Sequence, residues 1–132
     1  MRVIIGGGGR VGSGLARALR SEEKDVVLVD NDARAVKNAQ GMDILVLHGD
    51  ITQRQKFIEA GIESAQVYVA ATNSDERNIL SCALAKHVHD EETLCERSHP
   101  AAMHVEHEPG CAFAVLLICF VNRGFRSMFN KE

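Results

Sequence analysis

Glycines near the start of the chain form a pattern that could bind a dinucleotide. Gly7, Gly9 and Gly12 have the spacing G-x-G-x-x-G. In such sites the first glycine permits a tight turn, the second lets the backbone approach a pyrophosphate, and the third lets a helix pack closely on a strand. The free N–H groups and positive dipole end of the following helix attract the same anion. Alone the pattern is weak, because glycine-rich turns also occur by chance.

An acidic residue lies where the same chemistry requires one. Asp30 ends the apolar run 25–30 and follows Gly12 by 18 residues. A carboxylate near this spacing accepts hydrogen bonds from an adenosine ribose. It also favours NAD over NADP, because it would repel a 2′-phosphate, although Arg34 is near enough in the sequence to leave that preference open. The alternative is that Asp30 only caps the next helix or closes a turn.

Alternating strands and helices would position these residues. A β-branched run at 3–5 precedes the glycines, and Val11 and Leu15 begin a helical spacing after them. The expected elements then follow as a strand at 25–30, a helix at 31–40, a strand at 43–48, a helix at 52–60, a strand at 65–71, a helix at about 76–87 and a fifth strand at 93–97. This alternation predicts an α/β, Rossmann-like fold, a doubly wound parallel sheet of five or six strands with helices on both faces.

Polar residues gather where the expected strands end. Ligands of an open α/β sheet bind at the carboxyl ends of its strands. The clusters at these ends are residues 7–12, 30–32, 48–50 and 72–75. One extended nucleotide could touch all of them, which supports nucleotide binding more strongly than any single motif does.

Length and composition limit the other functions. The 132 residues suit one domain and leave no room for a separate substrate domain. A formal net charge of −3, with basic residues scattered among acidic ones, argues against nucleic-acid binding. No segment reaches the roughly 18 apolar residues of a membrane span, so we expect a cytoplasmic protein.

A histidine-rich stretch raises the hypothesis of a metal site. Histidines three residues apart share one face if their segment is helical. The candidates are His99, His104 and His107, with Glu106, Glu108 and Cys111 nearby. Solvated polar residues ahead of a Pro-Gly turn explain the stretch equally well, so we predict no metal ligand.

Catalysis is the main alternative to ligand sensing. A nicotinamide-dependent oxidoreductase must place a proton donor beside its cofactor. Tyr68 is the chain's one tyrosine, lies in an expected strand and is followed four residues later by Thr72, so the tyrosine–lysine pair of short-chain dehydrogenases is missing. We therefore predict no enzyme activity and no catalytic residue. A small NAD-dependent oxidoreductase and a nucleotide-independent assembly scaffold remain the alternatives.

Five stretches give the sequence a resemblance to a known family. They are residues 3–12, 29–32, 48–52, 59–63 and 70–78. In these stretches the chain resembles the KTN or TrkA-N family, also called the RCK N-lobe, the nucleotide-binding domain of potassium-transport regulators. The resemblance implies a Rossmann-like nucleotide-binding domain at 1–100, with 101–132 as a C-terminal extension of the same domain.

The resemblance also implies a function. It points to a cytoplasmic regulatory subunit that forms a homo-oligomer, a dimer or a ring, on a membrane-embedded potassium transporter subunit of the Trk or Ktr type. The subunit would be peripheral, on the inner face of the membrane. NAD or NADH, with ATP or ADP as the alternative, would bias the assembly between two arrangements and so gate the transporter.

Site residues carry over from the family by position. The expected cofactor-binding residues are Gly7, Gly9, Arg10, Val11, Gly12, Asp30, Asn31, Asp50, Ile51, Thr72 and Asn73. The resemblance implies that the glycines surround the phosphates and that Asp30 holds the adenosine ribose. Asp50 and Ile51 would flank the adenine, and Thr72 and Asn73 would lie near the distal end of the ligand. Arg10 either approaches a phosphate or is a solvated charge at a turn.

After Pro100 the sequence departs from the family pattern. A helix and a Leu-Gly-(small)-Asp turn into a sixth strand would be expected there, and that turn is missing. Instead, residues 111–121 form an apolar run that could be a buried sixth strand or a short self-association helix.

Overall fold

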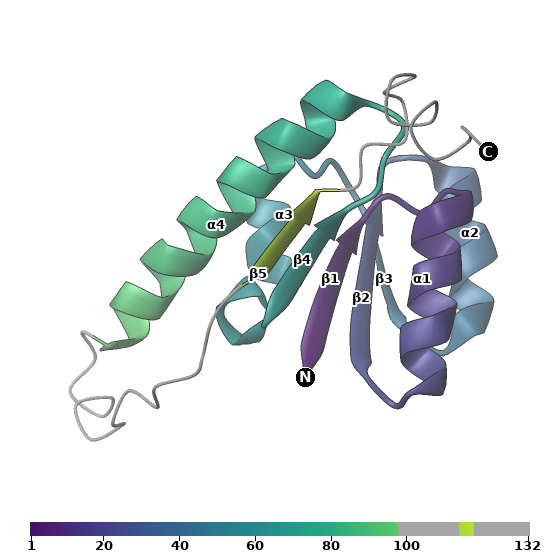
Figure 1. Ribbon diagram of the computed structural model, residues 1–132, viewed down its shortest axis with the longest axis horizontal. Coiled ribbons are helices and arrows are strands. Elements are labelled where there is room, and N and C mark those ends of the chain that lie inside the picture. Colours follow the sequence, from purple (N-terminus) through teal and green to yellow (C-terminus); the bar gives the residue numbers. More distant parts are fainter. Residues whose placement is uncertain (98–113, 118–132) are drawn as a thin grey trace, which may run out of the picture.

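The structure is a computed structural model that describes residues 1–97 and 114–117 (Figure 1). Its strands are β1 (Arg2–Gly6), β2 (Asp25–Asp30), β3 (Leu45–His48), β4 (Val67–Ala70) and β5 (Ala114–Leu117). Its α-helices are α1 (Arg10–Ser21), α2 (Ala33–Ala39), α3 (Arg54–Glu59) and α4 (Asp75–Arg97), with 3-10 turns at Gln40–Met42 and Ile62–Ser64. Strands and helices alternate along the described chain as far as α4.

All of the described strand pairs are parallel, in the order β3-β2-β1-β4-β5. At the centre of the sheet, Ile4 is in register with Val27 on one side and with Tyr68 on the other. Parallel neighbours need long crossover connections, which the helices provide. This arrangement confirms the predicted Rossmann-like α/β fold with a parallel sheet. The order reverses direction beside β1, so the carboxyl ends of β1 and β4 border the crevice where such folds bind ligands.

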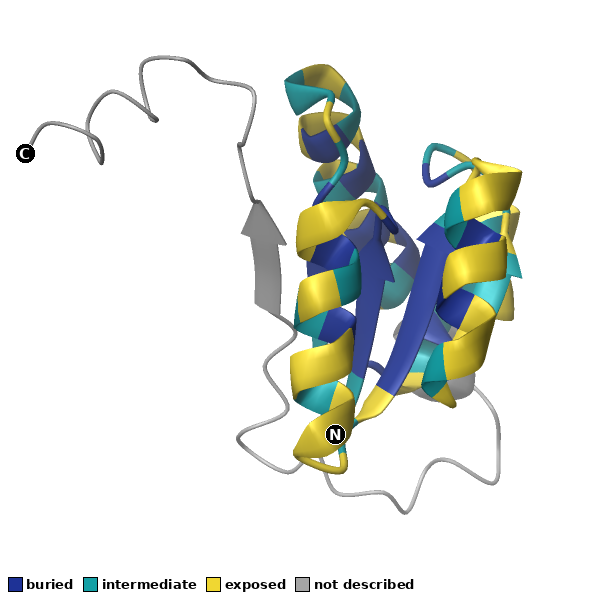
Figure 2. Cartoon of the chain, turned by 90° about the vertical axis from the view of Figure 1, so that its right-hand side faces the viewer, coloured by how far each residue is buried: buried dark blue, intermediate teal, exposed yellow. Residues whose placement is uncertain are grey.

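The sheet is buried between two layers of helices. Figure 2 shows its central strands in dark blue, while the outward sides of the helices are yellow. One face packs against α3 and α4 through a cluster that includes Ile4, Phe57 and Tyr68. The other face packs against α1 through a cluster that includes Leu28 and Ala16. Because strands buried on both faces need apolar residues at successive positions, the continuous runs at 3–5 and 26–29 form the centre of the sheet.

Helix α4 is longer than the sequence suggested. We expected it to end at about residue 87 and expected 93–97 to form a strand, and this prediction is wrong because α4 continues through Arg97. Its second half carries an ion pair one turn apart, Lys86 to Asp90 at 3.0 Å, and Arg54 of α3 binds two of its carboxylates. Such pairs support a helix where the apolar periodicity fades.

The apolar run at 111–121 contains a strand. Its residues Ala114–Leu117 are β5, which pairs in parallel with β4 so that Tyr68 is in register with Val115. The fifth described strand is thus at 114–117 and not at the expected 93–97, and 114–117 are not part of a self-association helix. The metal-site hypothesis at His99, His104 and His107 concerns residues outside those that the structure describes.

Within the described ranges, no helix combines the length and the hydrophobicity needed to cross a membrane.

Candidate functional site

The glycine turn joins β1 to α1 at the carboxyl edge of the sheet. Gly7 has a φ of +118°, and a Cβ there would lie 2.7 Å from the Ala71 carbonyl oxygen. A Cβ on Gly12 would lie 1.7 Å from the Gly7 carbonyl oxygen. The backbone therefore requires glycine at both positions, the first for the turn and the third for close packing of the helix.

Gly9, the second glycine of the pattern, is under no such constraint. A Cβ there would meet no atom within 4 Å. Gly9 is the N-cap of α1, and it is exposed. The fold itself therefore tolerates a side chain here, whereas a ligand pressed against the backbone would not.

The start of α1, like that of the short α3, lacks the polar groups found at the starts of α2 and α4. It has neither a capping side chain nor an acidic residue in its first turn. By contrast, the Asp32 side chain accepts a hydrogen bond from Arg34 N–H at the start of α2, and α4 carries Asp75 and Glu76 in its first turn. The unsatisfied N–H groups and positive dipole end of α1 are thus available to an external anion.

Ser13 and Asp30 fix the shape of the glycine turn. The Ser13 hydroxyl donates to the Gly8 carbonyl oxygen at 2.7 Å. The Gly8 N–H donates to Asp30 Oδ2 at 2.5 Å. Sequence analysis missed Ser13, because a serine in the first turns of a helix has no distinctive spacing. The two bonds hold the turn from both sides and stiffen a segment that glycines would otherwise leave flexible.

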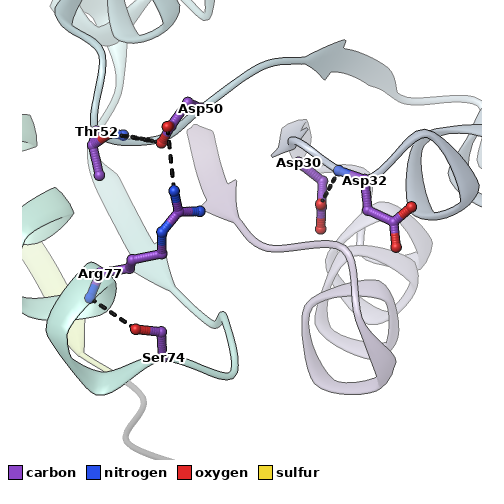
Figure 3. A network of polar contacts seen from close by, with 6 residues as sticks. All are labelled: Asp30, Asp32, Asp50, Thr52, Ser74 and Arg77. Carbon is purple, nitrogen blue, oxygen red and sulfur yellow. Dashed lines mark hydrogen bonds and ion pairs between the residues drawn. The ribbon is translucent and has the colours of Figure 1, made fainter.

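Asp30 lies at the end of β2 and faces the turn. Its second oxygen, Oδ1, accepts a hydrogen bond from the Asp32 N–H at 2.7 Å (Figure 3). Asp30 therefore does close a turn, one of the alternatives considered above, whereas Asp32 rather than Asp30 caps α2. Each carboxylate oxygen can accept a second hydrogen bond, and Asp30 is only partly buried, so it can still bind a ribose hydroxyl. Asn31 beside it is exposed, and its carbonyl oxygen lies 2.9 Å from His48 Nε2.

Asp50 anchors the loop between β3 and α3. Its Oδ1 accepts hydrogen bonds from the Thr52 N–H at 2.9 Å and the Thr52 hydroxyl at 2.7 Å. These bonds hold the pKa of Asp50 below its ordinary value, against the opposing effect of burial, and the charge of Arg77 lowers it further. The neighbouring Ile51 is 5% exposed and belongs to the core, where its side chain borders Gly6 at the end of β1. Of these two expected site residues, only Asp50 presents a side chain to the edge.

The turn from β4 into α4 is organised by Asn78, which is fully buried. Its Oδ1 accepts from the Thr72 N–H at 3.0 Å and from the Thr72 hydroxyl at 2.5 Å, and its Nδ2 donates to the Thr72 carbonyl oxygen at 3.1 Å. Asn73 is exposed beside this turn. The hydrogen-bond donors of Thr72 are thus already used within the protein, and Asn73 is the member of the expected pair that faces outward.

The remaining expected residues, Arg10 and Val11, are both exposed at the start of α1.

Tyr68 is a core residue. It is fully buried, its hydroxyl donates to Ser81 Oγ at 2.9 Å, and burial raises the pKa of that hydroxyl. A Cβ on Gly6 would lie 2.2 Å from the Tyr68 hydroxyl oxygen, so Gly6 makes room for the tyrosine. The hydroxyl is therefore enclosed beneath the sheet edge and cannot act as a proton donor to a ligand there.

A concave region lies at the opposite edge of the sheet. Its lining includes Arg20, Lys24, Asp25 and Asp43, near the amino ends of β2 and β3. Arg20 and Asp43 form an ion pair at 2.8 Å across it. Because parallel α/β sheets bind ligands at the carboxyl edge, and because these charges already pair, this region is not the candidate site. No cluster of three or more metal-binding side chains occurs in the part of the chain that the structure describes.

Comparison with known proteins finds a matching domain family and relatives that are named as potassium-uptake proteins. The sequence model of the TrkA-N domain matches residues 3–108. A relative in Methanothermobacter thermautotrophicus, named "Trk system potassium uptake protein TrkA homolog", is 42% identical over 101 residues, which are 76% of this chain and 47% of that protein. The chain thus spans about half the length of this relative.

Two solved structures resemble the fold. The TrkA-N domain of the inner membrane protein ybaL from Escherichia coli has a TM-score of 0.66 at 17% identity, covering 97% of this chain and 93% of that one. The Kef CTD of Shewanella denitrificans, in its AMP bound form, has a TM-score of 0.57 at 25% identity, covering 66% of this chain and 51% of that one. The first of these likenesses concerns the fold alone.

Proposed function

Because the chain belongs to the TrkA-N domain family, we propose that it is the nucleotide-binding part of a regulator of potassium uptake. NAD or NADH binds at the carboxyl edge of the sheet, in a domain at 1–100 that 101–132 extends. Binding shifts a homo-oligomer, a dimer or a ring, between two arrangements. The assembly sits in the cytoplasm on a membrane-embedded transporter subunit of the Trk or Ktr type and gates it.

The observation that carries the proposal is the start of α1. Its N–H groups have no capping side chain, its first turn has no carboxylate, and the exposed Gly9 leaves open space beside the backbone. A pyrophosphate would fill that space and accept hydrogen bonds from the free N–H groups. Glycine also suits this position as the N-cap of α1, and the missing side chain leaves the backbone open to a ligand.

Asp30 supports a dinucleotide with a free ribose. It lies beside the turn and has acceptor capacity left after binding Gly8 and Asp32. Its negative charge would repel a 2′-phosphate, which favours NAD and NADH over NADP. Arg34 lies on the first turn of α2 and is exposed, so it could in part offset that repulsion.

The relatives support a link to potassium and to adenine nucleotides. The Methanothermobacter relative is named as a potassium uptake protein. The Kef CTD was solved in an AMP bound form, which keeps ATP and ADP as the alternative ligands. Because the chain spans about half of the relative's length, the transporter partner and the gating belong to this proposal.

A regulatory role fits the site better than catalysis. Tyr68, the group that would serve an oxidoreductase, is enclosed in the core. A ligand can shift an assembly only by as much as its affinities for the two arrangements differ. A nucleotide-dependent change in oligomer size would therefore separate a sensor from a scaffold, and oxidation of NADH with a panel of carbonyl compounds would support the oxidoreductase instead.

The experiment is a ligand panel on the purified chain, with thermal unfolding and sedimentation as readouts. NAD, NADH, NADP, ATP and ADP are compared at one high concentration. A ligand at about one hundred times its Kd adds roughly 2.7 kcal/mol of stability, which raises Tm by several degrees. We expect NAD or NADH to raise Tm, NADP to raise it less, and the stabilising ligand to change the oligomer. No Tm shift with any nucleotide would contradict the proposal.

A further inference from the structure

An ion pair bridges two loops at the carboxyl edge of the sheet. Arg77 Nη2 in α4 lies 3.3 Å from Asp50 Oδ2 in the loop after β3. Ile51, the next residue in that loop, borders Gly6 at the end of β1. The bridge therefore lies close to the point where the chain leaves β1 for the glycine turn. In Figure 3, Arg77 and Asp50 lie on one side of that ribbon and Asp30 lies on the other.

Asp50 does not need Arg77 to hold its position. Its other oxygen, Oδ1, already accepts two hydrogen bonds from Thr52, at 2.9 and 2.7 Å. Those bonds also keep its pKa low, so the carboxylate is ionised at neutral pH. If the arginine turned away, Asp50 would remain fixed and charged, with its second oxygen open to water.

The contact between Arg77 and Asp50 is weak. A guanidinium offers five N–H donors, whereas its contact with Asp50 is one long hydrogen bond. The side chain is 41% exposed, while the base of the residue is fixed because its backbone N–H donates to Ser74 Oγ at 3.3 Å. The guanidinium can therefore turn toward a neighbouring anion without moving the helix.

The start of α4 would not attract an anion without this side chain. Asp75 and Glu76 occupy its first turn and neutralise the helix dipole there. Arg77 is consequently the cation at the start of α4 that can attract a phosphate. Its planar fork also suits two phosphate oxygens better than one carboxylate oxygen.

We propose that Arg77 is a specificity-determining residue that reads the phosphate charge of the bound nucleotide. When phosphates occupy the glycine turn, the guanidinium leaves Asp50 and binds a phosphate oxygen. The ligand class is then a nucleotide that carries a diphosphate or a longer phosphate chain. This inference rests on the proposed function, because it assumes that a nucleotide occupies the turn.

The test compares the Kd for NAD and for ADP, measured by calorimetry, among four forms of the chain. They are the wild type, Arg77→Gln, Arg77→Lys and the control Lys86→Gln, which removes another ion-paired cation from α4, farther along the helix. We expect Arg77→Gln to raise the Kd about tenfold, the size of one charge-assisted hydrogen bond. Arg77→Lys keeps the charge and should recover most of the affinity, and Lys86→Gln should bind both nucleotides like the wild type.

The Tm measured without ligand distinguishes a role of Arg77 in nucleotide binding from a role in stabilising the fold. The bridge is half-exposed, so Arg77→Gln should leave Tm nearly unchanged. An unchanged Kd in Arg77→Gln, equal losses in the Gln and Lys variants, or an equal loss in Lys86→Gln would overturn the inference. If the wild type binds either nucleotide and Arg77→Gln binds it equally, only the role of Arg77 fails. If the wild type binds no nucleotide, the proposed function fails with it.

Discussion

The Gly8 N–H donates a hydrogen bond to Asp30 Oδ2 at 2.5 Å, and this bond joins the glycine turn to the end of β2. The same carboxylate that would bind the ribose thus also positions the turn that would bind the phosphates. The two halves of the site are therefore coupled through one side chain.

Replacing Asp30 should affect both stability and ligand choice. Asp30→Asn removes the charge and one of the two acceptor oxygens, so we expect a loss of about 1–2 kcal/mol in the free energy of unfolding. It should also narrow the preference for NAD over NADP, because the repulsion of a 2′-phosphate disappears. Urea unfolding and calorimetric titration measure the two effects.

Asp32→Asn is the matched control for that change. Asp32 caps α2 through its Oδ1, and Asn caps a helix about as well as Asp does. We expect it to leave stability and nucleotide preference nearly unchanged. If Asp30→Asn and Asp32→Asn had equal effects, Asp30 would act only through its contribution to the net negative charge and not through its specific contacts.

Two glycines of α1 should respond in opposite ways to alanine. Gly12→Ala places a Cβ 1.7 Å from the Gly7 carbonyl oxygen, so the helix must move and several kcal/mol of stability should be lost. At Gly14 a Cβ meets nothing within 4 Å, so Gly14→Ala should gain roughly 0.5–1 kcal/mol from helix propensity. Chemical denaturation of both variants checks this, and a stable Gly12→Ala would contradict the packing described here.

Removing the Tyr68 hydroxyl should weaken the fold but not the site. Tyr68→Phe leaves Ser81 Oγ without this donor in the core, which should lower the free energy of unfolding by about 1 kcal/mol. Nucleotide affinity should stay within error of the wild type, since the hydroxyl is enclosed. Circular dichroism melting and calorimetry provide the two readouts. A large loss of affinity without a loss of stability would instead favour an oxidoreductase.

Because of Asp50, the free energy of unfolding should decrease as the pH falls into the acid range. Its pKa in the folded protein is lowered from 3.8 mainly by the Thr52 hydrogen bonds. A lowered folded pKa adds stability that is fully present above the unfolded pKa, near 3.8, and that is lost as the pH falls through the folded value. The difference in unfolding free energy between wild type and Asp50→Asn should therefore be constant above about pH 5 and shrink below it. A difference that grows in acid would contradict this assignment.

The glycine turn could be predicted from the sequence because it depends on local backbone geometry. A fixed spacing of glycines indicates positions where a Cβ would not fit. In the structure a Cβ would clash with the backbone at Gly7 and Gly12. The buried centre of the sheet could be predicted for a similar reason, since its continuous apolar runs distinguish strands covered on both faces.

Other features could not be predicted because they depend on contacts between distant segments. Arg77 meets Asp50 across 27 positions of sequence, and no spacing rule relates them. The sequence does not distinguish the buried Asn78 from other polar residues near a helix start, although it organises the turn after β4. The length of α4 depends partly on ion pairs with Arg54 of α3, so its apolar pattern alone placed its end too early.

The most direct test of the central claim, that a nucleotide's phosphates bind at the start of α1, is the Kd for NAD and ADP in Gly9→Ala compared with Gly14→Ala. A Cβ meets no protein atom within 4 Å at either position. Alanine is a poorer N-cap than glycine, so Gly9→Ala should cost at most about 1 kcal/mol of stability and should still fold. If phosphates bind there, Gly9→Ala weakens binding at least about tenfold, whereas Gly14→Ala binds as the wild type does. Unchanged nucleotide affinity in a folded Gly9→Ala would contradict the account.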